Sequence, residues 1–244
     1  MGTYNYRTHF SNSRSSYNYD IGEGLPNYDP YVYPNGTLQN KFCIESYAKL
    51  REMECERLKD KVITPEFVRS RQLDIDLLKA IHKYIFDEFY DWAGQFRIIT
   101  LHKQEEFFIP GLSIEYATPD KLVPEIKKSI CRLNAVRWSE LSEDDLAKEL
   151  AMRTAEIWKI HPFRDGNTRA ILGFIKVFAM EHGITLDMTV FTNLLSRPMK
   201  DGKVIGYSVR DMFVGACLNE KPEPEHLIEL FKKAIKEGKK NSAS

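Results

Sequence analysis

Two long helical stretches separated by a short polar loop constrain this chain most strongly. The first follows Ser142, whose spacing to Asp145 resembles a helix-capping box, and it runs with one apolar face up to His161. The second begins near Asn167, is apolar over much of its circumference, and has Gly183 as its expected C-terminal stop. Because a helix that is apolar on most sides must be buried, the sequence predicts a bundle around this second helix.

Helical periodicity recurs along most of the remaining chain. Val123 is expected on the buried face of the helix that Thr118 opens. Residues 96–101 and 107–109 are rich in strand formers and flank a polar tip at 102–106, so they predict a β-hairpin that lies against helices. The fold class is therefore mainly α, a helical bundle with one small β-hairpin. We expect the other helices within residues 38–61, 77–85, 118–133, 190–195, 209–218 and 227–235.

Composition divides the chain into three parts. Residues 1–35 are irregular and hold seven of the twelve tyrosines, which indicates either a tail packed along the domain or an arm for partner docking and self-modification. Residues 36–220 carry the helical patterns and form the main domain. Residues 221–244 form a C-terminal amphipathic helix with an end at 239–244 that we expect to be disordered.

Charge and cysteine content exclude several classes of protein. Lys+Arg and Asp+Glu both number 35, and this neutrality argues against a nucleic-acid partner. The four cysteines are far apart and lack metal-binding spacing, so we expect reduced and mostly packed thiols of a cytoplasmic protein. No apolar run approaches the roughly 18 residues that span a bilayer, and the polar N-terminus does not resemble a signal peptide. We therefore expect no membrane partner.

The loop between the two long helices reads H-P-F-R-D-G-N-T-R from His161 to Arg169. His161 is a candidate general base near neutral pH, and Asp165 is a hard oxygen ligand suited to Mg²⁺. Phe163 is expected to anchor the loop in the core, whereas Arg164 is expected to face solvent or a partner. A satisfied loop pair of His161 and Asp165 is the structural alternative.

The second half of the loop predicts an anion site at a helix N-terminus. Gly166 permits close approach of the backbone, so the N–H groups of Gly166, Asn167 and Thr168 can surround a phosphate. Arg169 can bind phosphate oxygens in bidentate fashion. These residue types in this order favour phosphoryl or nucleotidyl transfer from a nucleoside triphosphate.

This loop resembles the signature H-x-F-x-[D/E]-G-N-x-R of the Fic family. Asp29-Pro30-Tyr31 and Asp91-Trp92-Ala93-Gly94, together with Arg97 before the hairpin, are also similar to that family. The resemblance implies the Fic fold and transfer of AMP from ATP, with Mg²⁺, to a Tyr, Thr or Ser hydroxyl of a target protein, releasing pyrophosphate. The residues it assigns are His161 as base, Asp165 as metal ligand, and Gly166, Asn167, Thr168 and Arg169 as phosphate-binding residues. It also makes the hairpin a flap that holds the target segment as an added strand, with Leu101, His102, Lys103, Phe107 and Phe108.

Two positions depart from the full signature H-P-F-x-[D/E]-G-N-G-R-x-x-R. Thr168 replaces its third glycine and Leu172 replaces its second arginine. Two alternatives therefore stay open: a transferase of another phosphate-containing group, such as the phosphate transfer of the Doc toxins, and a catalytically weak pseudoenzyme that binds a partner. No stretch fits the family's inhibitory pattern [S/T]-x-x-x-E-[G/N], although Glu237-Gly238 resembles its end. This favours an uninhibited enzyme, or one that a separate small antitoxin protein restrains, acting in the cytoplasm or in the cytosol of a target cell.

Overall fold

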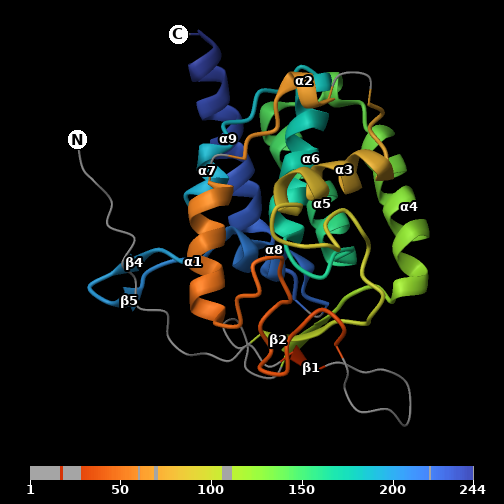
Figure 1. Cartoon of the computed structure of the whole chain (residues 1–244). Coiled ribbons are helices and arrows are strands. Elements are labelled where there is room, and N and C mark those ends of the chain that lie inside the picture. The colour runs from red at the N-terminus through yellow and green to blue at the C-terminus, as the bar shows by residue number, and fades with distance from the viewer. Residues whose placement is uncertain are drawn as a thin grey trace.

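The computed structural model describes residues 17–18, 29–59, 61–68, 71–105, 112–219 and 221–243. Two helices form its centre (Figure 1). Helix α5 spans Glu143–Ile160, and Ser142 caps it by accepting a hydrogen bond from the Asp145 N–H, as the spacing predicted. Helix α6 spans Asn167–Glu181 and is buried along most of its length, which confirms the prediction of a central helix.

The other long helices pack around this pair. Helix α3 contacts α6, α4 contacts α5, and α8 and α9 contact α5. In Figure 1, α4 lies on one side of the central pair, and α1 and α9 lie on the other. The fold is mainly α, as expected. The helices outside the central pair are α1 Tyr47–Leu58, α2 Pro65–Val68, α3 Ile75–Phe86, α4 Leu122–Asn134, α7 Thr189–Thr192, α8 Val209–Cys217 and α9 Glu225–Ala243.

Helix α1 begins later than the periodicity predicted. The segment before it is closed by Asn40, whose side chain bonds both the N–H and the carbonyl of Ile44. Ser46 then caps the helix through the Lys49 N–H. An asparagine that satisfies nearby backbone groups competes with helix formation, so residues 38–46 stay irregular.

The hairpin exists, but the predicted position of its first strand is wrong, and the predicted second strand at 107–109 lies outside the described residues. Strand β2 is His102–Glu105 and pairs antiparallel with β3, Leu112–Glu115, so the expected polar tip is itself a strand. Residues 96–101 are not a strand because Arg97 binds the backbone of the His161 loop instead of a neighbouring strand. Phe107 and Phe108 lie outside the described residues. A third strand, β1 Tyr17–Asn18, pairs with β2, which is therefore the central strand of this sheet.

A second hairpin was missed in the sequence. Strands β4, Met199–Lys200, and β5, Lys203–Val204, pair across the turn Asp201-Gly202. Both turn residues have positive φ, the conformation that Asp-Gly favours in two-residue hairpin turns. The hairpin projects beyond α1 in Figure 1.

Three smaller expectations also fail. Helix α9 continues to Ala243 through the segment expected to be disordered, because Lys239 pairs with Glu143 and Asn241 bonds Asp187. Val123 is exposed on α4. The cysteines are free but mostly exposed, and only one of the four is buried. Within the described ranges, no helix is both long and apolar enough to cross a membrane.

Candidate active site

The loop from His161 to Arg169 enters and leaves through two residues with positive φ. His161 ends α5 at φ 53°, and Gly166 precedes α6 at φ 76°. The left-handed conformation at both positions reverses the chain, so that the C-terminus of α5 and the N-terminus of α6 meet in one loop. A non-glycine residue rarely adopts this conformation, which makes the backbone at His161 a strained feature that its surroundings must hold.

Arg97 holds the backbone of this loop from the neighbouring segment. Its Nε donates to the His161 carbonyl at 2.8 Å, and its backbone N–H donates to the Pro162 carbonyl at 2.9 Å. The rest of the guanidinium bonds the carbonyls of Ile99 and Ala117. The side chain is buried, so these carbonyls have little access to water. Arg97 therefore fixes the position of His161 without facing the cavity.

Arg97→Met is expected to lower the free energy of unfolding by more than about 3 kcal/mol, since it leaves several buried carbonyls unsatisfied at about 1–3 kcal/mol each. Urea denaturation followed by circular dichroism measures the change. The exposed Arg137→Met serves as the control and should stay within about 0.5 kcal/mol of the parent. A stability of Arg97→Met equal to that of the control would contradict this account of the loop.

The ring of His161 is fixed by two aromatic neighbours. Tyr116, which follows β3, stacks on it with ring centroids 4.1 Å apart, and Trp158 of α5 meets it edge-on at 5.2 Å. The residue stays partly exposed and lines the cavity. A histidine held in one orientation at the edge of a cavity is placed to accept a proton from a bound group.

The N-terminus of α6 opens into the same cavity. Its first N–H groups, on Asn167, Thr168 and Arg169, meet no acceptor among the described residues, as is usual for the first turn of a helix. The Gly166 N–H is already bound at 2.7 Å to Oδ1 of Asp165. The positive end of the helix dipole and the Arg169 guanidinium, which lies over the Phe86 ring, complete an anion-binding arrangement.

The Asn167 side chain closes the loop through two hydrogen bonds to the backbone of Phe163. Its amide receives the Phe163 N–H at 2.9 Å and donates to the Phe163 carbonyl at 2.8 Å. We therefore expect Asn167 to bind phosphate through its backbone N–H. Phe163 is fully buried and stacks on His82 at 3.8 Å, which confirms its expected role as the anchor of the loop.

His82 of α3 holds the loop through Asp165 and Phe163. This role was not recognised in the sequence. Nδ1 of His82 accepts the Gly94 N–H at 2.9 Å, so Nε2 carries the proton and donates to the Asp165 carbonyl at 3.0 Å. Burial lowers the pKa of His82 to about 4, so the ring is neutral at physiological pH. A buried histidine cannot be told from a surface one by sequence when no pattern marks it.

Arg164 does not face solvent, contrary to expectation. It is buried and forms an ion pair with Asp29, with its Nε and Nη2 at 3.0 and 2.7 Å from one carboxylate oxygen. The pair ties the segment at Asp29 to the loop across 135 positions of the sequence. A contact of such long range cannot be read from local periodicity.

The hydroxyl of Thr168 is directed toward the core. It accepts a hydrogen bond from the buried Trp158 indole N–H at 3.0 Å. Thr168 therefore has a structural partner at the position where the full signature carries glycine.

Thr168→Val is expected to lower the free energy of unfolding by about 1–3 kcal/mol, because the indole N–H of Trp158 loses its acceptor while the side-chain volume is kept. Thr168→Ser keeps the hydroxyl and should remain within about 1 kcal/mol of the parent. Thermal or urea unfolding of the three proteins decides the point. Equal stability of the valine and serine variants would mean that the hydrogen bond from Trp158 to Thr168 does not stabilise the fold.

These residues line one open cavity of about 230 Å³. It collects His161, Asp165 and Arg169 from the loop and Leu101 and Tyr116 from the two ends of the flap. Leu101 is buried, and the side chains of His102 and Lys103 lie outside the described part of the structure. The structure thus brings the predicted base, the predicted metal ligand and the anion site together.

A network behind Asp165 was also missed in the sequence. Arg51 of α1 lies 3.7 Å from Oδ2 of Asp165 and 2.5 Å from Oε2 of Glu54. The other oxygen of Glu54 accepts the Tyr90 hydroxyl at 2.5 Å. Burial raises the pKa of Glu54, and Arg51 opposes that shift. The only signal in the sequence was a glutamate at the position that shares a helical face with Leu50.

Asp165 fits a magnesium ion. Its side chain is part exposed in the cavity, and one carboxylate with substrate phosphates is a usual Mg²⁺ environment. The described residues contain no cluster of three or more His, Cys, Asp or Glu that could hold a metal alone. A cation would therefore need oxygens from the substrate as well.

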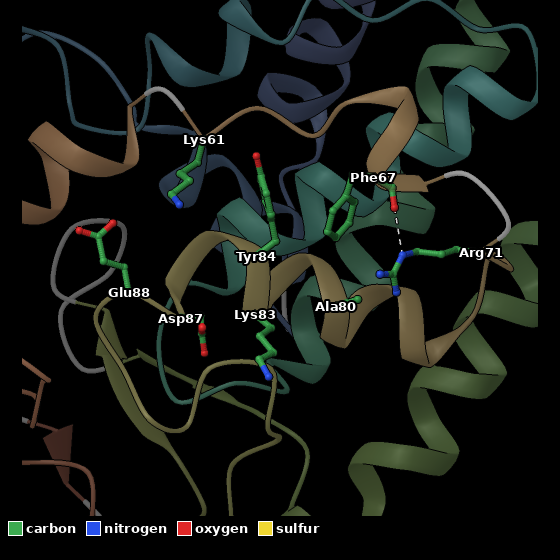
Figure 2. Close-up of a pocket in the computed structure, with 8 residues that line it drawn as sticks. All are labelled: Lys61, Phe67, Arg71, Ala80, Lys83, Tyr84, Asp87 and Glu88. Atoms are coloured by element: carbon green, nitrogen blue, oxygen red, sulfur yellow. Dashed lines mark hydrogen bonds between the residues drawn. The ribbon is translucent and has the colours of Figure 1, made fainter.

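A second, larger cleft lies on the other face of α3 (Figure 2). It measures about 600 Å³, and Figure 2 shows Phe67 and Tyr84 facing each other above the helix. Its acids are paired outside it, Asp87 with Lys41 and Glu88 with Arg57. None of the loop residues lines it, so it is not the catalytic cavity.

The Glu237-Gly238 segment lies far from this cavity. Lys239 and Lys232 of α9 pair with Glu143 and Asp144 in the first turn of α5. His161 follows the last turn of α5, about 25 Å away at 1.5 Å per residue. An inhibitory role for this glutamate is therefore excluded in the present arrangement of the helices.

Comparison with known proteins agrees with this geometry. The family model described as "Fic/DOC family" matches residues 72–179. A protein adenylyltransferase, VbhT, of Bartonella schoenbuchensis is 28% identical over 65% of this chain, but the match covers only 32% of VbhT. A probable protein adenylyltransferase, y4lH, of Sinorhizobium fredii is 34% identical over 65% of this chain and 79% of its own length.

A solved structure shares the fold. The BepC protein of Bartonella tribocorum, a VirB-translocated effector crystallised with bound AMPPNP, is 22% identical with a TM-score of 0.63. The likeness covers 84% of this chain and 95% of BepC. The region matched by the family model contains α5, most of α6 and the whole loop from His161 to Arg169. Because y4lH is 34% identical and is matched over 79% of its length, this chain belongs to the Fic/DOC family.

Proposed function

We propose that this protein transfers AMP from ATP to a Tyr, Thr or Ser hydroxyl of a target protein. The observation that carries the proposal is the juxtaposition, in one cavity, of the oriented His161 and the open N-terminus of α6. The names of two relatives, VbhT and y4lH, as adenylyltransferases support the same reaction.

The reaction balances with the groups in the cavity. The target hydroxyl oxygen forms a bond to the α-phosphorus of ATP, its proton passes to His161, and the bond from the α-phosphorus to the bridging oxygen breaks. The products are the AMP-modified protein and pyrophosphate. Arg169 and the N–H groups of Asn167 and Thr168 stabilise the charge that develops on the phosphates. Mg²⁺ on Asp165, when bound, would neutralise further phosphate charge.

The flap is proposed to hold the target segment. Since β2 is the central strand of its sheet, an added strand can pair with the outer edge of β3 or of β1, or take the place of β1. β3 continues directly to Tyr116, which stacks on His161. A target strand on β3 would thus carry its hydroxyl toward the base.

We propose an inhibitor protein as a second partner, in addition to the target protein. No segment of the 244 residues fits the inhibitory pattern [S/T]-x-x-x-E-[G/N]. Glu237 belongs to α9, which contacts the first turn of α5, the end of that helix opposite His161. We assign restraint of the enzyme to a separate small antitoxin protein, as in a toxin–antitoxin pair. The proposed place of action is the cytoplasm, or the cytosol of a cell into which the protein is delivered.

Two labelled nucleotides test the transferred group. The protein is incubated with a cell lysate and Mg²⁺, once with ATP labelled at the α-phosphate and once with ATP labelled at the γ-phosphate. The proposal expects protein-bound label from the α-phosphate alone, and none with His161→Ala. Label from the γ-phosphate alone would contradict the transfer of AMP and indicate Doc-like phosphorylation. No label from either nucleotide would favour a partner-binding pseudoenzyme.

A further inference from the structure

Helix α6 supplies only one cation to the phosphate site. Arg169 lies in its first turn, and Leu172, one turn later, is apolar and 4% exposed. Departure of pyrophosphate places growing negative charge on the leaving oxygens, which enzymes stabilise with positioned cations. A second side-chain cation for these phosphates can therefore come only from another element of the fold.

Helix α1 places Arg51 at this position. Arg51 lines the cavity with Asp165 and Arg169, and its side chain is 31% exposed. Its Nη1 lies 3.7 Å from Oδ2 of Asp165, beyond hydrogen-bond distance. The guanidinium therefore stands beside the proposed metal ligand with part of its surface open to the cavity.

Two positioning residues hold Arg51 in place. Glu54 is 1% exposed, and its two oxygens bind Arg51 Nη1 and the Tyr90 hydroxyl, both at 2.5 Å. A guanidinium has five N–H donors, and within the described residues Arg51 uses only those of Nη1. The remaining donors are oriented and can form bidentate bonds to phosphate oxygens.

The other arginines of the cavity are placed differently. Arg164 is committed to its ion pair with Asp29, where the two side chains are 3% and 2% exposed. Arg210 lines the cavity from the first turn of α8 and is the competitor that a test must include. Arg51 lies 3.7 Å from Asp165, through its Nη1 and the Oδ2 of the carboxylate.

The position of Arg51 also selects the phosphates it can reach. In an in-line displacement, the attacking hydroxyl and the leaving group lie on opposite sides of the α-phosphorus. His161 receives the proton of the hydroxyl, so the leaving pyrophosphate lies on the side away from it. Arg51 lies beside Asp165, which would hold the Mg²⁺ ion that neutralises phosphate charge, whereas His161 is held by Tyr116 and Trp158.

We infer that Arg51 is the second phosphate-binding cation of this enzyme, supplied by α1 in place of the arginine that Leu172 replaces. It binds the β- and γ-phosphates of ATP and stabilises the leaving pyrophosphate, while Glu54 and Tyr90 position it. This inference rests on the proposed function, since it assigns a role within the same ATP site.

The test compares two variants that differ only at Arg51. Arg51→Met alone would leave the buried Glu54 carboxylate without its partner and risks unfolding. Glu54→Gln keeps the shape and the cation, whereas the double variant Arg51→Met/Glu54→Gln removes the cation with no buried charge left. Isothermal titration calorimetry with Mg²⁺ measures the Kd of each for ATP, AMP and pyrophosphate.

The inference predicts a loss that depends on the phosphates present. Relative to Glu54→Gln, the double variant should bind ATP and pyrophosphate about 10- to 100-fold more weakly, the value of charge-assisted hydrogen bonds. Its Kd for AMP should stay within about threefold, because AMP lacks the phosphates that Arg51 contacts. Arg57→Met, on the same helix but paired with Glu88 at the surface, is the matched control and should bind all three ligands as the parent does.

Three outcomes would overturn the inference. Equal affinity for ATP in the two variants would make Arg51 a structural residue only. An equal loss for AMP and ATP would indicate a distorted cavity. A larger and phosphate-selective loss in Arg210→Gln, with the double variant unaffected, would assign the cation to α8.

The binding data and the labelling experiment together separate this inference from the proposed function. A parent that binds neither ATP nor pyrophosphate would overturn both. ATP binding that depends on Arg51, combined with no transfer of α-labelled phosphate to protein, would overturn the transfer of AMP alone.

Discussion

Replacing His161 with alanine is expected to lower the rate of AMP transfer by about 10²- to 10⁴-fold, the usual contribution of a general base. The expectation follows from the placement of the ring, which Tyr116 and Trp158 hold at the cavity that also receives the N-terminus of α6. ATP binding should change little, because the phosphate contacts belong to the other end of the loop. Single-turnover transfer and calorimetric binding measure the two quantities separately.

His182→Ala is the matched control for this result. His182 lies after the opposite end of α6, is exposed, and should leave the rate unchanged. If His161→Ala weakened ATP binding as strongly as it slowed transfer, His161 would be a binding residue and not a base.

Gly166→Ala is expected to be the most damaging single substitution in the loop. A Cβ at this position would overlap the Phe86 ring, and φ at 76° is unfavourable for any residue with a side chain. Positive φ costs about 1–2 kcal/mol and overpacking about 1–3 kcal/mol more, so a loss of about 3 kcal/mol or more is expected. The displaced loop should also lose its affinity for ATP.

Gly183→Ala isolates the conformational part of this effect. Gly183 has φ 71° but no atom within 4 Å of an added Cβ, so its substitution should cost about 1–2 kcal/mol and leave ATP binding intact. Urea denaturation and calorimetry of both variants give the comparison. Equal losses of stability in the two would mean that the contact with Phe86 does not constrain the loop.

The sequence predicted the elements whose evidence is local. Helical periodicity located α5 and α6, Ser142 and Gly183 marked two of their ends, and the residue types of the loop indicated an anion site. These features depend on spacing within one or two turns of chain. The position of the first flap strand was wrong because strand propensity at 96–101 was overridden by Arg97, whose partners are 2 to 65 positions away.

The supports of the site could not be predicted in the same way. His82 contacts Asp165 across 83 positions, Arg164 pairs with Asp29 across 135, and Arg51 approaches Asp165 from a separate helix. Each contact depends on the packing of elements that local patterns do not orient. Thr168 illustrates the same limit, since its hydroxyl bonds Trp158, a partner that only the meeting of α5 and α6 provides.

The stoichiometry of products tests the central claim most directly. Purified protein, Mg²⁺, ATP and a target protein that accepts label are incubated, the modified protein is weighed by intact mass spectrometry, and released pyrophosphate is counted. The account predicts an added AMP group on a hydroxyl side chain and one pyrophosphate for each group added, both absent with His161→Ala. A phosphate adduct accompanied by release of ADP would contradict it.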